Sequence, residues 1–165
     1  MKAITLHQPY ASALASGLTR YDTRSWKIQY RGPIAIHAGK KPVGTDEFTV
    51  LTERINTLCP RRFISAASLP FGSVVAVAEL RDCVEITDEM IAGIGPVERV
   101  LGDWQAGRHA WLITNMRRFE QPVEHRGLPG MWDWDSPEDL LARPAVPQTD
   151  DAGIWLSPAQ RMRYR

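Results

Sequence analysis

The chain has 165 residues, of which 44% are hydrophobic and 24% charged, and its formal net charge is +1. These values are typical of a single globular domain with a substantial core. No apolar run approaches the roughly 18 residues of a membrane-spanning helix, and the first residues lack the apolar core of a signal peptide. Cys59 and Cys83 lack metal-ligand spacing and are expected to be free thiols. The composition therefore predicts a cytoplasmic protein without a membrane partner.

The first part of the chain predicts short strands and two helices. Strands are expected at 3–6, 21–26 and 34–38, where short alternating or apolar stretches lie next to turn residues. A helix is expected at 11–16, because Pro9 suits a first helical turn and Gly17 can end the helix in a left-handed conformation. A second helix is expected from Thr45 as its cap, since Asp46 and Glu47 favour the positive end of the helix dipole.

The remainder of the chain supplies the expected centre of the sheet. The β-branched run "SVVAVAEL" at 73–80 predicts a central strand, and further strands are expected at 109–114 and 116–123. Helical segments are expected from Thr87 or Asp88 and, in "SPEDLL", from Ser136. We therefore predict an α+β fold in residues 1–136, with a small curved antiparallel sheet or barrel of about five or six strands and flanking helices. Residues 137–165 are expected to form a short helix and a Pro-rich, partly flexible tail.

The charge is unevenly distributed along the chain. Residues 1–44 contain seven Lys and Arg residues and a single acidic residue, Asp22, whereas residues 45–103 contain twice as many acidic as basic residues. This asymmetry favours one face that binds anions. The alternative is a solvated basic face that acidic neighbours balance in the folded protein.

The stretch "YDTRSW" combines an acid, a base and an indole. In a strand, residues two apart share a face, so Asp22, Arg24 and Trp26 are expected on one side. An arginine held between a carboxylate and an indole can present its outer edge to a phosphate or a base. The alternative is an internal Asp–Arg ion pair with Trp26 in the core.

Two histidines lie in conspicuous positions. His7 and Gln8 precede a helix start, with Tyr10 in its first turn, where free N–H groups suit anions; alternatively, His7 and Gln8 only cap the turn. In "IAIHAGKK", the isoleucines share one strand face and His37 lies on the other. His37 would lie beside the strand of Arg24 if the two strands pair. The alternative role for His37 is a hydrogen-bonded structural residue.

The segment 7–42, "HQPYASALASGLTRYDTRSWKIQYRGPIAIHAGKKP", resembles the N-terminal signature of the ASCH (activating signal cointegrator homology) family. The matching positions are 7–10, Gly17, 22–26, 31–32 and 38–41, and fainter similarity continues to about residue 134 in "GSVVAVAEL", "LGDWQAGRHAWLI" and "QPVEHRGLPGMWDW". The resemblance implies a PUA-like β-barrel with helices beside a central cleft. It also implies a nucleic-acid partner, with RNA favoured over DNA and DNA still open as an alternative. We expect no resident cofactor.

On this resemblance, Arg24, Trp26 and Tyr30 would line the cleft, and Arg31, Lys40 and Lys41 would stand at its mouth. Cations there can position a backbone, and aromatic rings can stack a base. The complete set of expected nucleic-acid-binding residues is His7, Gln8, Tyr10, Arg24, Trp26, Tyr30, Arg31, His37, Lys40 and Lys41.

Three alternatives to a binding domain remain open. One branch of the family resembles amidohydrolases acting on acetylated cytidine, but the position of their lysine is Thr19 here, and a threonine cannot replace an amine. Another branch is similar to metal-dependent ribonucleases. A divalent metal would then be required, and Tyr30, His37 and Lys40 could serve phosphodiester cleavage. The third alternative is a coregulator module that binds a protein partner through its tail and Trp155.

Overall fold

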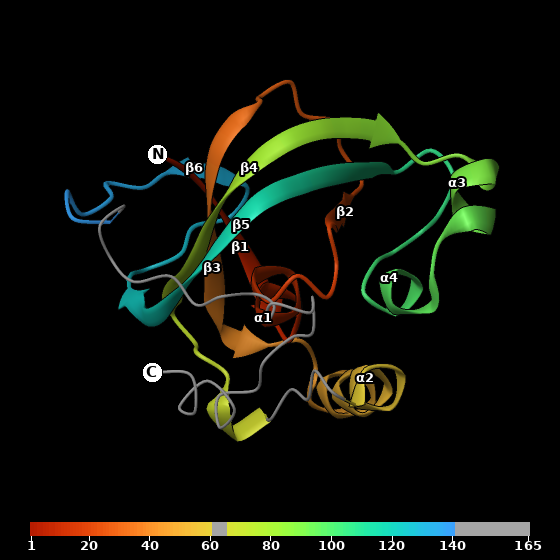
Figure 1. Ribbon diagram of the computed structural model, residues 1–165, viewed down its shortest axis with the longest axis horizontal. Coiled ribbons are helices and arrows are strands. Elements are labelled where there is room, and N and C mark those ends of the chain that lie inside the picture. Colours follow the sequence, from red (N-terminus) through yellow and green to blue (C-terminus); the bar gives the residue numbers. More distant parts are fainter. Residues whose placement is uncertain (61–65, 141–165) are drawn as a thin grey trace, which may run out of the picture.

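The computed structural model describes residues 1–60 and 66–140 (Figure 1). Its strands are β1 (Lys2–Gln8), β2 (Tyr21–Arg24), β3 (Gly32–Pro42), β4 (Ser73–Glu85), β5 (His109–Glu124) and β6 (Met131–Asp133). Its helices are α1 (Tyr10–Ala15), α2 (Thr45–Leu58), α3 (Asp88–Gly93) and α4 (Pro96–Val100), with a 3-10 turn, η2, at Ala66–Ser68.

The six strands form one sheet in the order β2-β5-β4-β3-β1-β6. β1 and β3 run parallel, whereas every other neighbouring pair is antiparallel. The sheet curls around α1 (Figure 1), but its edge strands β2 and β6 do not pair with each other, so the barrel is open. The predicted α+β fold with about six strands and flanking helices is confirmed. The expectation of a purely antiparallel sheet is wrong at the β1–β3 pair.

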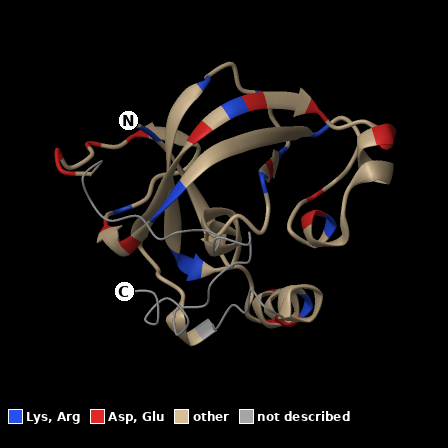
Figure 2. Cartoon of the chain, in the orientation of Figure 1, with Lys and Arg blue, Asp and Glu red and all other residues tan. Residues whose placement is uncertain are grey.

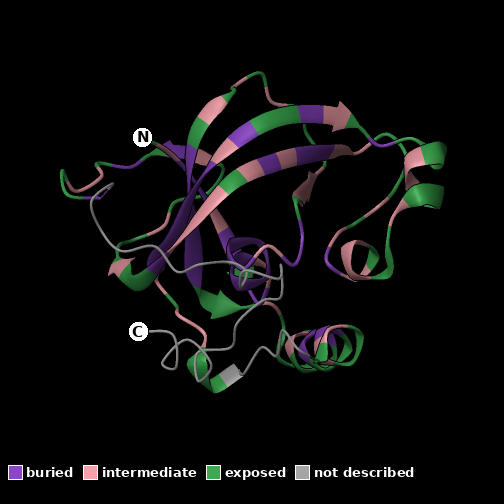
Figure 3. Ribbon diagram, in the orientation of Figure 1, coloured by how far each residue is buried: buried purple, intermediate pink, exposed green. Residues whose placement is uncertain are grey.

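The two faces of the sheet bury separate cores, as the alternation along β3 predicts. Ile34, Ile36 and Ala38 pack with Leu14 of α1 on the concave face. Ala35 packs with a cluster on the opposite face that contains Phe119, Trp132, Trp134 and Leu140. α1 and the central strands are accordingly buried, whereas α3 is largely exposed (Figure 3). Leu140, which belongs to the segment expected to form a short helix and tail, packs in this second core.

Several predicted boundaries differ from the structure for local reasons. The strands expected at 109–114 and 116–123 are one strand, β5, which continues through Asn115 at a φ of 51°. β6, with three residues, is too short to produce a recognisable pattern. The N-cap of α2 is Gly44 and not Thr45, whereas Thr87 caps α3 as expected and its hydroxyl accepts from Met90 N at 3.2 Å.

The C-terminal predictions are only partly covered by the structure. In the described part of the segment expected to start a helix at Ser136, the backbone forms a turn at residues 138–140, and Leu140 N donates to Pro137 O. The rest of the predicted tail lies outside the described residues. Among residues 1–60 and 66–140, no helix combines the length and the apolar character needed to cross a bilayer.

Candidate ligand pocket at the Asp22 and Arg24 pair

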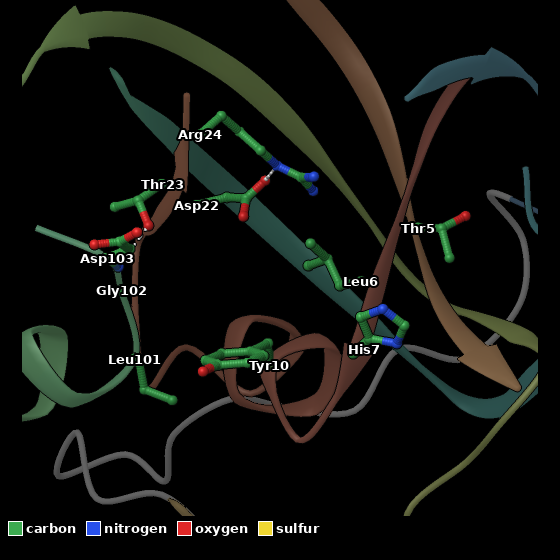
Figure 4. A pocket seen from close by; sticks show the side chains of 10 residues that line it. All are labelled: Thr5, Leu6, His7, Tyr10, Asp22, Thr23, Arg24, Leu101, Gly102 and Asp103. Carbon is green, nitrogen blue, oxygen red and sulfur yellow. Dashed lines mark hydrogen bonds and ion pairs between the residues drawn. The ribbon is translucent and has the colours of Figure 1, made fainter. Parts of the chain in front are cut away.

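A pocket of about 230 Å³ opens where β1, α1 and β2 meet the segment that follows α4 (Figure 4). We call it the Arg24 pocket. Its lining residues are Thr5, Leu6, His7, Tyr10, Asp22, Thr23, Arg24, Leu101, Gly102 and Asp103. Four separate parts of the chain therefore contribute to one concave surface, and the lining includes His7, Tyr10, Asp22 and Arg24, which were singled out in the sequence.

Arg24 is held in place by two neighbours. Its Nε donates to Asp22 Oδ2 at 2.8 Å, and its Cζ lies 5.7 Å from the ring centroid of the buried Trp111. The outer guanidinium nitrogens have no hydrogen-bond partner within the described chain, and Figure 4 shows them pointing toward Leu6 and the interior of the pocket. The arginine thus presents several N–H donors from a fixed position, which is the arrangement that favours planar, bidentate recognition.

Asp22 makes the pocket close to neutral. Burial raises the pKa of the Asp22 carboxyl, and the adjacent Arg24 guanidinium offsets that effect only in part. Its side chain is 12% exposed against 25% for Arg24, so the pair is shielded but still reached by solvent on the arginine side. With one carboxylate against one guanidinium, the pair presents donors and acceptors without a net positive charge.

Replacing Asp22 by Asn should therefore change the pH dependence of stability. A carboxyl whose pKa is raised by folding binds more protons in the folded state, so its contribution falls as pH rises through the interval between the unfolded and folded pKa values. Asn does not titrate, so the variant lacks this pH-dependent contribution to stability. We expect the stability of Asp22→Asn relative to the parent chain to be greater at pH 7 than at pH 4, as measured by urea unfolding at both pH values. If the difference in stability between the variant and the parent chain were the same at both pH values, folding would not raise the pKa of Asp22.

The segment after α4 forms a rigid wall of the pocket. Asp103 N donates to Thr23 Oγ1 at 2.8 Å, and Trp104 packs edge-on against Tyr21 with its Nε1 donating to Glu98 O at 2.7 Å. A Cβ on Gly102 would lie 2.5 Å from Trp104 Nε1, so only glycine fits there. These residues come from "LGDWQ", to which no role was assigned from the sequence.

Glu98 anchors α4 to the start of β2. It accepts hydrogen bonds from Arg20 N at 2.9 Å and from the hydroxyl of Thr19. Thr19 is 5% exposed and its hydroxyl also lies 3.0 Å from Tyr21 O. The position that carries a lysine in the amidohydrolase branch therefore holds a structural residue in this chain.

The wall formed by β1 and α1 carries two further predicted residues. The hydroxyl of Tyr10 donates to Glu47 Oε1 at 3.4 Å, and burial, followed by the charge of Glu47, raises the pKa of Tyr10. His7 is exposed, and its Nδ1 donates to Lys41 O at 3.1 Å. That bond brings the end of β3 next to the pocket.

Three other predicted residues use their polar atoms within the fold. Gln8 is fully buried, and its amide bonds to Ser12 and to Pro70 O. The hydroxyl of Tyr30 donates to Pro33 O at 2.6 Å. Arg31 donates to the carbonyls of its own loop and to Asp82 Oδ1 at 2.9 Å. None of the three lines the Arg24 pocket.

The predicted common mouth of Arg31, Lys40 and Lys41 is wrong. Arg31 immediately precedes β3, whereas the lysines lie near its other end, so almost the whole strand separates them. Of the three, Lys41 is the one joined to a pocket residue, through the bond between its carbonyl oxygen and His7. Both lysines are exposed, and neither forms an ion pair with a described residue.

Trp26 and His37 lie outside the pocket on different sides. Trp26 is 38% exposed and packs edge-on against Trp111 at 4.6 Å, so it shares with Arg24 the same buried indole. His37 is 1% exposed and meets Trp132 of the second core edge-on, on the opposite face of the sheet. β2 pairs with β5 and not with β3, so the condition for placing His37 beside the strand of Arg24 is not met.

The basic N-terminal part is balanced only in part in the folded chain. Lys2, Arg24 and Arg31 form ion pairs with Asp133, Asp22 and Asp82. Figure 2 shows Lys and Arg interspersed with Asp and Glu along the described chain. Within residues 1–60 and 66–140, no group of three or more His, Cys, Asp or Glu side chains could hold a metal ion.

Comparisons with known proteins identify the family. The ASCH domain model matches residues 4–123, and the chain belongs to the ASCH domain family, which is generally associated with nucleic acids. Activating signal cointegrator 1 of Homo sapiens and that of Mus musculus are each 30% identical over 81 residues, which cover 49% of this chain and 14% of each relative. The aligned part is thus a small fraction of those proteins.

Two solved structures from Zymomonas mobilis are similar. The ASCH protein has 13% identity and a TM-score of 0.49, with 99% of this chain and 92% of that chain covered. A point mutant of the protein has 15% identity and a TM-score of 0.42, with 74% of each chain covered.

Proposed function

We propose that this chain binds single-stranded RNA, with one unstacked base in the Arg24 pocket and backbone phosphates at Lys40 and Lys41. The observation that carries this proposal is the guanidinium of Arg24, which Asp22 holds by Nε while its outer N–H donors point into the pocket. Family membership supports a nucleic-acid ligand, and unpaired bases are the usual targets of sequence-specific RNA recognition.

The charge balance of the pocket favours a base over a phosphate. A phosphate group needs a net positive site, whereas Asp22 neutralises Arg24 at 2.8 Å and Asp103 lies on the rim. An uncharged base offers both acceptors for the arginine and donors for a carboxylate. The volume of about 230 Å³ accommodates one base and excludes a paired duplex.

The surroundings of the pocket fit the rest of a nucleotide chain. Lys41 adjoins the His7 side of the pocket, where exposed ammonium groups can contact phosphates. Trp26, exposed beside Trp111, offers a surface for stacking an adjacent base. Contacts to the RNA phosphates and a stacking surface would then lie on either side of the Arg24 pocket, which selects one base.

The direct test compares single-stranded RNA, duplex RNA and duplex DNA in gel-shift titrations with and without Mg²⁺. We expect a shift for single-stranded RNA that does not require Mg²⁺ and is reduced when one base is replaced by an abasic site. No shift at low salt would overturn the proposal. Loss of intact RNA only when Mg²⁺ is present would support the ribonuclease alternative instead.

Removing the charges of Lys40 and Lys41 together should reduce the salt dependence of binding. Each neutralised phosphate contributes about −0.7 to the log–log slope on a single strand, so Lys40→Ala/Lys41→Ala should flatten the slope by roughly one unit or slightly more. Fluorescence anisotropy between low and moderate salt measures the slope. Arg54→Ala/Arg81→Ala, which removes the same charge from α2 and β4, is the matched control. Equal effects of the two double variants would show that the lysines act only through net charge.

A further inference from the structure

His37 is a buried histidine with one satisfied and one unsatisfied ring nitrogen. It is 1% exposed in β3, and its Nε2 lies 2.9 Å from His125 O. A carbonyl oxygen only accepts, so Nε2 carries the hydrogen and the neutral ring has a bare Nδ1. Nδ1 is buried and has no hydrogen-bond partner among the described residues.

The segment that covers His37 consists of residues 125–130, between β5 and β6. It lies so close that a Cβ on Gly127 would be 2.5 Å from His37 Nδ1 and 2.7 Å from Thr5 Oγ1. Besides the His37 bond, Thr5 Oγ1 donates to Leu128 O at 2.9 Å, and the ring of His125 stacks on Trp132 at 5.2 Å. A few polar contacts thus close the segment over His37.

We propose that His37 and residues 125–130 form a pH-operated latch, which is closed when His37 is neutral and opens when its Nδ1 is protonated. The added proton creates a second N–H donor that faces Gly127 and finds no acceptor. A buried charge with an unsatisfied donor is unfavourable, whereas opening of the segment lets water reach Nδ1. Opening on the 125–130 side breaks the 3.1 Å bond from His125 N to Gly72 O but leaves the central β1–β3–β4 ladder intact.

The charged groups around His37 do not offset the cost of a buried positive charge on its ring. Thr5 of β1 and Val74 of β4, which flank it in the sheet, are uncharged. Trp132 of β6 meets it edge-on at 5.9 Å, and Asp133 is engaged by Lys2. On the covering segment and the end of β5, the candidates are Glu124, His125 and Arg126.

Those candidates do not stabilise a proton on Nδ1. Glu124 and Arg126 are exposed, and His125 Nδ1 donates to Arg126 O at 2.8 Å. Burial lowers the pKa of His37, the bond to the His125 carbonyl offsets this partly, and the ring charge of His125 lowers it further.

The sign of the pH dependence follows from proton linkage. In the closed state His37 has a depressed pKa, so it binds fewer protons than in the open state between the two pKa values. Opening therefore becomes more favourable as pH falls below the ordinary histidine range near 6.5. One proton gives at most about a tenfold increase in the opening constant per pH unit.

Amide hydrogen exchange at pH 7 and pH 5, corrected for the intrinsic rate, tests the latch in the full chain. In the parent chain we expect faster corrected exchange in 125–130 at pH 5, with no comparable change in β3 or β4. His37→Gln cannot titrate and should lose this response. His125→Gln is the matched control, because it removes the other titratable ring but keeps the carbonyl that His37 contacts, so the response should remain.

NMR of the histidine imidazoles in the parent chain gives a second test that does not depend on whether the variants fold. We expect the Nε2–H tautomer of His37 at pH 7 and amide shifts in 125–130 that follow the His37 titration. Amide shifts that follow the titration of His125 would overturn the latch. So would pH-independent exchange in the parent chain, or a response that survives His37→Gln and disappears in His125→Gln.

Discussion

Replacing Arg24 by lysine is expected to weaken binding of single-stranded RNA by about 5- to 150-fold, which corresponds to the roughly 1–3 kcal/mol of a charge-assisted hydrogen bond. Lysine keeps the positive charge beside Asp22 but lacks the fork of N–H donors that points into the pocket. The melting temperature should change by only a few degrees, because the ion pair can be retained and the arginine already reaches solvent.

Arg31→Lys provides the matched control for this prediction. Arg31 is also paired with an aspartate at 2.9 Å, but it lies at the other end of β3 from Lys40 and Lys41 and does not line the pocket. Anisotropy titrations should give RNA affinity near that of the parent chain for this variant. If Arg24→Lys melts far earlier yet binds normally when folded, Arg24 is a structural partner of Asp22 and not a ligand-binding residue.

Truncation of Trp111 to alanine should have the largest effect on stability, a loss of about 3–5 kcal/mol. Trp111 is fully buried in the core on the α1 side, and it contacts both Arg24 and Trp26. Chemical unfolding measures the loss. RNA affinity of the remaining folded protein should also fall, because the indole that positions Arg24 is absent.

Trp26→Ala separates the two roles of this aromatic pair. Trp26 is 38% exposed, so removal of its indole should destabilise the fold much less than removal of the Trp111 indole. It should still weaken RNA binding, because a stacking surface is lost. Equal losses of stability in the two variants would show that Trp26 belongs to the core, which was the alternative interpretation of "YDTRSW".

Most of the secondary structure could be predicted because its signals are local. The β-branched run of β4, the alternation in β3 and the acidic first turn of α2 each lie within a few residues. β6 was missed because three residues carry no periodicity, and β5 was divided because the sequence gives no sign that a strand continues through a left-handed Asn115.

The site was harder to predict because it depends on partners distant in the sequence. The contact between Asp22 and Arg24 follows from strand alternation, and its presence in the structure agrees with that expectation. The engagement of Arg31 by Asp82, however, depends on which strands become neighbours. The same is true of the wall formed by residues 101–103, which reaches β2 only because α4 folds back on it.

The position of β1 between β3 and β6 has a consequence for the order of folding during synthesis. β1 is made first, yet one of its edges pairs with β6, where Ala3 lies opposite Trp132. Closing a loop of nearly the whole described chain is entropically unfavourable until other contacts have formed. While the chain emerges from the ribosome, the outer edge of β1 stays unpaired until residues 131–133 are available. We therefore expect nascent chains that end before β6 to be more prone to aggregation than the completed domain.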